Sequence, residues 1–175
     1  LLPMPQATIG MEVVVQEIGG QLRNWNVLTR QNGAITSSQG GFDFNVEGRT
    51  IRAPDIAFTP RNIYRNLTAQ QLWTFQGQPF TPVFVVEVGD TTKNSDFERL
   101  NEKFKNIYFA PETSVQLGWL VDPRNQQLWS YKRTVTGVLR PYNHGWRNMD
   151  TIVNNREILP GFTLDVKSII ESISQ

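Results

Sequence analysis

Two acidic residues stand in segments whose other residues are mostly apolar. Asp55 follows Pro54 and precedes the apolar run 56–58, and Glu87 follows the apolar run 83–86. We interpret both segments as buried strands that carry an acid near one end. A buried carboxylate destabilises a folded protein unless a cation or hydrogen-bond donors neutralise it. The pair therefore indicates a binding site for a divalent metal ion.

Hydrolysis of a phosphodiester bond is the chemistry that such a pair can support. The reaction needs an activated water and neutralisation of the negative charge that builds on the phosphate. Mg²⁺ (or Mn²⁺) does both while one or two carboxylates hold it. We expect Asp55 and Glu87 to be the metal ligands, with the backbone carbonyl of Val88 as a third oxygen. A nearby lysine would orient or deprotonate the water and stabilise the charged transition state.

Hydrophobic spacing predicts the elements that must position these acids. We expect helices over 8–27, 69–75, 96–108 and 166–174, and strands over 34–38, 41–46, 50–51, 115–122, 127–132 and 134–139 in addition to the two acidic ones. Thr68 is the expected N-cap of the second helix, and Asn94 or Ser95 that of the third. This order predicts a mixed sheet with helices on it, an α/β (α+β) single domain over 1–175.

Composition limits the classes of protein to consider. The 175 residues suffice for one domain with a real core. The formal net charge is only +1, so binding to DNA would need positive charge concentrated in one place. The absence of cysteine excludes disulfides, thiolate zinc sites and a cysteine nucleophile. Neither a bilayer-spanning run nor a signal peptide is recognisable, so we expect an intracellular protein, cytoplasmic or nuclear, without a membrane partner.

Five ordered motifs carry a resemblance to a known family. They are RAPDIAF (52–58), FVVEV (84–88), EKF (102–104), LGWLVDP (117–123) and LPGFTLD (159–165). Pro54-Asp55 followed by Glu87 resembles the PD-(D/E)XK nuclease superfamily, and the ordered set is similar to its Uma-two family of putative restriction endonucleases. The resemblance implies a restriction-endonuclease-like mixed central sheet flanked by helices, and a metal-dependent endonuclease acting on DNA. It also makes a homodimer a candidate state, because duplex cutters of this superfamily often pair.

The lysine of the superfamily pattern is displaced in this chain. The residue two positions after Glu87 is Gly89, and in the resembling family the lysine is expected from the following helix. Lys103 and Lys105 are the candidates there. At about 100° per residue they fall on opposite flanks of the apolar stripe, so only one can face the Glu87 strand. We prefer Lys103, keep Lys105 open, and regard Lys93 in the preceding loop as a third candidate.

The resemblance adds two further residues. In this superfamily an acid on the first helix often completes the site, and Glu12 matches it. Glu17 is the alternative, although its place on the helix favours solvent exposure. Tyr108 matches a tyrosine that the family often carries after the displaced lysine.

Purely structural roles also fit several of these residues. Asp55 after Pro54 also fits a turn cap, and Glu87 with Lys103 also fits a buried ion pair without a catalytic role. The displaced lysine supports a second hypothesis, a catalytically inactive nuclease-fold domain that binds nucleic acid or has a structural role. We expect packing in the core or on a hairpin for Trp73, Trp119 and Trp129. Four arginines bracket the Asp55 strand and fit either phosphate contacts or a solvated surface: Arg49, Arg52, Arg61 and Arg65.

Overall fold

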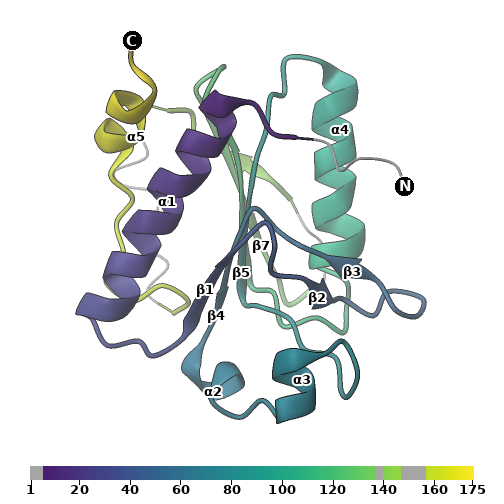
Figure 1. Ribbon diagram of the computed structural model, residues 1–175. Helices are drawn as coiled ribbons and strands as arrows, with labels where there is room; N and C mark the ends of the chain where they lie inside the picture. The colour runs from purple at the N-terminus through teal and green to yellow at the C-terminus, as the bar shows by residue number, and fades with distance from the viewer. Residues whose placement is uncertain (1–5, 137–139, 147–156) are drawn as a thin grey trace.

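The centre of the fold is a mixed sheet of six strands in the order β1-β4-β5-β6-β7-β8 (Figure 1). The computed structural model describes residues 6–136, 140–146 and 157–175. The strands of this sheet are β1 (Ala34–Ser37), β4 (Ile56–Thr59), β5 (Phe84–Val88), β6 (Leu117–Asp122), β7 (Gln127–Lys132) and β8 (Tyr142–Asn143). Strands β5 and β6 run parallel, and the other neighbours are antiparallel. A separate hairpin pairs β2 (Phe42–Asp43) with β3 (Ile51–Arg52).

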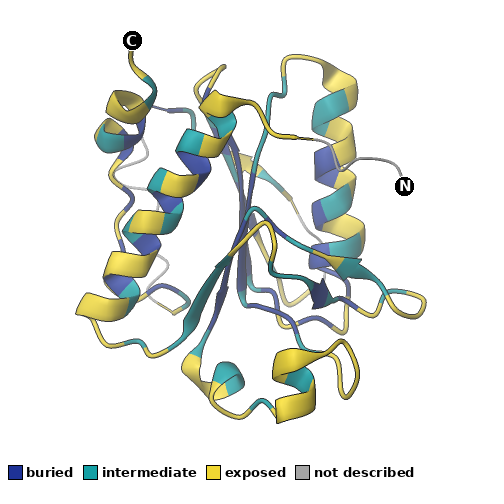
Figure 2. Cartoon of the chain, in the orientation of Figure 1, coloured by how far each residue is buried: buried dark blue, intermediate teal, exposed yellow. Residues whose placement is uncertain are grey.

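Helices cover both faces of this sheet. They are α1 (Ile9–Leu28), α2 (Arg61–Tyr64), α3 (Ala69–Trp73), α4 (Asn94–Lys103) and α5 (Val166–Ile173), and a π-helical segment, η1 (Phe104–Tyr108), continues α4. Figure 1 shows α1 and α5 together on one face and α4 on the other, with α2 and α3 at one end of the sheet. Figure 2 shows the buried residues on the central strands and on the inner sides of α1 and α4. The molecule therefore has two apolar layers, one on each side of the sheet.

Strand β5 belongs to both layers. It lies between β4 and β6, and this explains its run of aromatic and β-branched residues. Phe84 and Val86 pack into the layer under α1 and α5, and Val85 packs into the layer under α4. Because side chains alternate along a strand, Glu87 faces the same side as Val85. The chain thus directs one acid into the layer covered by α4.

The predicted fold class, a mixed sheet flanked by helices, is confirmed. Thr68 caps α3 as predicted, and its side chain and that of Gln71 form a reciprocal capping box. The predicted cap of α4 was wrong, since α4 begins after Lys93 and neither Asn94 nor Ser95 is its N-cap.

Two predicted strands differ from the structure. The expected strand 41–46 is reduced to β2, because Asn45 and Glu47 adopt positive φ angles and turn the chain. Residues 134–136 are not in a strand, and 137–139 lie outside the described residues, so β7 pairs with β6 and β8 instead. Among the described residues, no helix is long and apolar enough to cross a bilayer.

Candidate active site

Asp55 lies in a bend immediately before β4, which corrects the strand predicted for it. Pro54 lacks the N–H that a strand ladder needs, so pairing begins only after Asp55. When the β4–β5 register is continued by one residue, Asp55 comes opposite Glu87. The Asp55 carboxylate accepts a hydrogen bond from the Val88 N–H (2.8 Å) through Oδ2. This bond holds the Asp55 side chain at the end of β5.

Glu87 is the buried acid of the site, with 5% of its surface exposed. Its Oε1 atom lies 2.9 Å from the Nζ atom of Lys103, whose side chain is 27% exposed. The same oxygen accepts a hydrogen bond from the hydroxyl of Tyr108. Residues from β5, α4 and η1 therefore meet at one carboxylate oxygen.

The π-helical segment explains how Lys103 and Tyr108 reach the same carboxylate. Residues five apart on a regular α-helix point about 140° away from each other. In η1 the Phe109 N–H instead donates to the Phe104 carbonyl (2.9 Å), an i→i+5 bond that widens the turn. Five residues then make nearly one full turn, so Lys103 and Tyr108 share a face. The single helix predicted over 96–108 did not contain this feature.

The electrostatics of the site centre on the two neighbouring acids. Burial, and after it the negative charge of Glu87, raise the pKa of Asp55 from its usual 3.8 to about 7. The hydrogen bond from Val88 and the positive charge of Lys103 act in the opposite direction. Asp55 therefore carries its charge at a cost in the folded protein, and a cation bound beside it would reduce that cost.

Tyr108 remains a hydrogen-bond donor at neutral pH. Burial raises its pKa well above the usual value, and the negative charge of Glu87 acts in the same direction. Arg52, on β3, lowers the same pKa, so its positive charge acts on the buried site from the hairpin. Of the four bracketing arginines, Arg52 is thereby linked to the site.

The donor set fits a hard divalent cation that keeps most of its water. Asp55 and Glu87 offer carboxylate oxygens, and Mg²⁺ is commonly held by one or two carboxylates together with several waters. In the described part of the chain, no group of three or more His, Asp or Glu side chains is arranged to hold a metal ion. A transition-metal site with several imidazole ligands is therefore absent from those residues.

The structure separates the candidate lysines. Lys103 faces Glu87, whereas Lys105 is exposed on a different side of the helix, in η1. This agrees with the helical spacing. Lys93 is exposed at the N-cap of α4.

Glu12 is exposed on α1 and accepts a hydrogen bond from Gln16 on the same helix (3.2 Å). Its part in the site stays a prediction. Glu17 is the less exposed of the two, contrary to expectation, and it accepts a bond from Gln21 (3.0 Å).

Sequence reasoning assigned no role to Asp122, which is fully buried at the end of β6. Its carboxylate accepts hydrogen bonds from the backbone and side chain of Thr91 (2.8 and 2.6 Å) and from the Asn125 backbone (2.9 Å). These bonds fix the loop between β5 and α4, and hence the start of the helix that carries Lys103. An acid that closes an apolar strand before Pro123 is the signal that could have identified it.

Comparisons with known proteins identify the family and the fold. A family model described as "Putative restriction endonuclease" (Uma2) matches residues 1–167. The fold is similar to the crystal structure of a putative nuclease belonging to DUF820 from Anabaena variabilis ATCC 29413. The TM-score is 0.64 at 15% sequence identity, over 98% of this chain and 85% of that one. No curated protein matches this chain. Because the family model covers nearly all of the sequence, the chain belongs to the Uma2 family of putative restriction endonucleases.

Proposed function

We propose that this protein is an endonuclease that hydrolyses phosphodiester bonds of DNA and depends on Mg²⁺ or Mn²⁺. The observation that carries the proposal is the convergence of Lys103 and Tyr108 on Glu87, beside the Asp55 carboxylate. Membership of the family supports a nuclease broadly. The metal, DNA as the substrate and the roles of individual residues are the proposal.

Asp55 and Glu87 would hold the ion, and the carbonyl of Val88 would add a third oxygen. When bound, the ion supplies charge neutralisation at the phosphate and lowers the pKa of a water. Asp55 must be ionised to take part, and its pKa of about 7 makes deprotonation a condition of ion binding. We therefore expect cleavage to rise with pH between about 6 and 8 at a fixed, low concentration of Mg²⁺.

Lys103 is the proposed electrostatic partner of the reaction. Its ammonium group lies 2.9 Å from Glu87 and retains part of its exposure, so it can reach both the carboxylate and an incoming phosphate. A fixed positive charge at a site of developing negative charge is a large contribution to catalysis. Tyr108 would act as a positioning residue, because its hydroxyl holds the Glu87 carboxylate in one orientation.

The second candidate function is an inactive nuclease-fold domain that binds nucleic acid or has a structural role. The same contacts favour it, because Lys103 neutralises the charge of Glu87 and Tyr108 donates a hydrogen bond to it, as in a structural ion pair. The two candidates differ in what Asp55 would do. An inactive domain has no need to keep Asp55 charged beside a second carboxylate.

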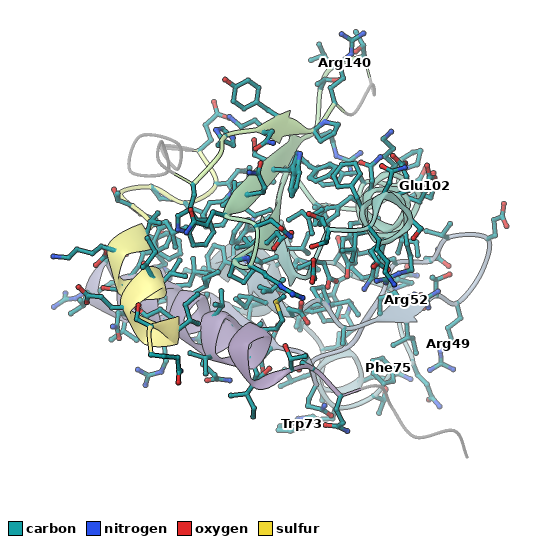
Figure 3. The ribbon with its side chains drawn as sticks, turned by 90° about the horizontal axis from the view of Figure 1, so that it is seen from above. Arg49, Arg52, Trp73, Phe75, Glu102 and Arg140 are labelled. Atoms are coloured by element: carbon teal, nitrogen blue, oxygen red, sulfur yellow. The ribbon has the colours of Figure 1, made fainter. Side chains whose placement is uncertain are left out.

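Cleavage of supercoiled plasmid in Mg²⁺ or Mn²⁺ tests the proposal. We expect nicked or linear product from the wild type and none from Glu87→Ala. Glu102→Gln is the matched control, since Glu102 is an exposed acid on α4, labelled in Figure 3, and its replacement should leave cleavage unchanged. No product from folded wild-type protein with either metal would favour the inactive domain. A mass measurement in solution tests the homodimer proposed for duplex cutting.

A further inference from the structure

Three large apolar side chains are exposed within four residues at the end of α3. Leu72 is 43% exposed, Trp73 80% and Phe75 50%. The exposure of Trp73 at the end of α3 corrects the core or hairpin packing predicted for it. Scattered exposed apolar residues need no explanation, but a cluster with two aromatic rings marks a contact surface. We call Trp73, Phe75 and the adjacent Arg49 the aromatic platform.

Arg49 and the β2–β3 hairpin hold the platform in place. The Arg49 guanidinium lies 5.9 Å from the centre of the Phe75 ring, and its Nη2 donates to the Phe75 carbonyl (3.3 Å). The outer edge of the ring lies close to Gly41, where an added Cβ would come within 3.1 Å of Phe75 and of Ile51. Figure 3 shows Trp73, Phe75, Arg49 and Arg52 along one side of the molecule. The ring and the cation are therefore ordered before any partner binds.

The charge beside the platform suits a polyanionic partner. Arg49 lies against the Phe75 ring, and Figure 3 shows Arg52 on the same side of the molecule. The other two arginines of residues 48–81 line a different pocket. Exposed aromatic rings beside arginine match a single nucleic-acid strand, whose bases have flat faces for stacking and whose phosphates are negative. Paired bases are stacked on one another and leave no face for Trp73.

The platform is connected to the candidate active site. Phe75 and Phe42 line one pocket of about 320 Å³. From Phe42, ring contacts lead to Phe44 (6.4 Å between centroids) and on to Tyr108 (5.1 Å), whose hydroxyl donates to Glu87. Arg52 lies on the same hairpin, and its charge acts on Tyr108. The platform therefore rests on the hairpin whose buried rings pack against Tyr108 of the candidate site.

We propose that Trp73 and Phe75 stack unpaired bases of a DNA strand while Arg49 contacts its backbone. The substrate of the site would then be DNA with a single-stranded portion. The cleavage part of this inference rests on the proposed nuclease function, but strand binding by the platform does not.

Fluorescence anisotropy with a labelled 20-nucleotide oligo(dT) in EDTA tests the platform without cleavage. We expect Trp73→Ala and Phe75→Ala each to weaken binding about fivefold or more, the loss expected for one stacking contact. Leu72→Ala is the matched control, since it removes a neighbouring exposed apolar side chain that has no ring, and it should change affinity less than twofold. Trp73→Phe should retain most of the affinity. A 20-base-pair duplex should bind all variants alike.

Three results would overturn the inference. The first is equal oligo(dT) binding by Trp73→Ala and Leu72→Ala. The second is that Trp73→Ala loses binding to anionic vesicles while its oligo(dT) binding is unchanged. The third is that Trp73→Ala converts a wild-type dimer to a monomer while oligo(dT) binding is unchanged. Because binding is measured in EDTA, an inactive wild type would refute the nuclease proposal and leave the platform standing. Plasmid cleavage by the wild type, together with unaltered oligo(dT) binding by Trp73→Ala, would support the nuclease proposal and refute the platform.

Discussion

The two faces of the central sheet use the same strand in different ways. Under α1 and α5, Phe84 and Val86 of β5 pack among apolar side chains only, with Trp119 edge-on to Phe84 (4.6 Å). Under α4, Val85 is followed by Glu87, which needs Lys103 and Tyr108 to be buried there. Apolar packing on the first face stabilises the fold, whereas burial of the charged Glu87 on the second face destabilises it in part. Changes on the two faces should therefore separate stability from activity.

The largest effects are expected from a matched pair of core substitutions. Phe84→Ala and Phe104→Ala each remove a fully buried ring, and each should lower the free energy of unfolding by about 3–5 kcal/mol. Only Phe104 begins η1, where it stacks on Tyr131 (4.2 Å), so only its loss should also lower cleavage per folded molecule. Urea unfolding measures the loss of stability, and cleavage rates corrected for the folded fraction measure the loss of activity. Equal activity losses would contradict the division between the faces.

Lys103→Met should give the next largest effect, on activity. We expect cleavage to fall about 100-fold, since a fixed cation at the reacting phosphate is lost. Replacing one partner leaves Glu87 without its cation, so the free energy of unfolding should fall as well. Lys105→Met is the matched control, because Lys105 is exposed on the other flank of the helix. A plasmid assay that shows equal rates for the two variants would remove Lys103 from the mechanism.

Asp55→Asn should change the dependence of stability on pH. The pKa of Asp55 is about 7 in the folded protein against a usual 3.8. The folded state therefore holds this proton more tightly, and its contribution to stability is lost as pH rises from about 4 to 7. Asparagine cannot ionise, so the metal-free variant should gain about 4 kcal/mol relative to the wild type between pH 4 and pH 8. Urea unfolding at both pH values measures this, and a constant difference would exclude a raised pKa for Asp55 in the folded protein.

Tyr108→Phe should give the smallest effect. It removes one hydroxyl and its hydrogen bond to Glu87 while the ring stays in place. We expect about 1 kcal/mol less stability and about a tenfold fall in cleavage, because Glu87 loses one of its two restraints. Wild-type rates with reduced stability would limit Tyr108 to a structural role.

The acids could be predicted from the sequence because their neighbours are informative. Pro54 and the apolar residues around Glu87 mark both positions. Helical spacing indicated that only one of Lys103 and Lys105 can face Glu87, and the resemblance of the EKF motif to the family pattern favoured Lys103. The convergence of Tyr108 on the same carboxylate could not be predicted, because widening of a helical turn to i→i+5 leaves no pattern in the residues.

The aromatic platform was missed for a different reason. Residue type alone does not say on which side of a short helix Trp73 will lie, and burial is the default for tryptophan. The arginines of residues 48–81 were visible in the sequence, but the sequence did not show that Arg49 lies against an exposed ring.

Titration with Mn²⁺ at pH 8 tests the central claim most directly. Isothermal calorimetry should show an ion bound by the wild type and by Glu102→Gln. The heat of binding should disappear in Asp55→Asn and in Glu87→Gln, both of which keep the shape of the side chain and remove its charge. Equal binding by all four proteins would place any ion elsewhere, and it would leave the buried contacts of Glu87 as a structural ion pair.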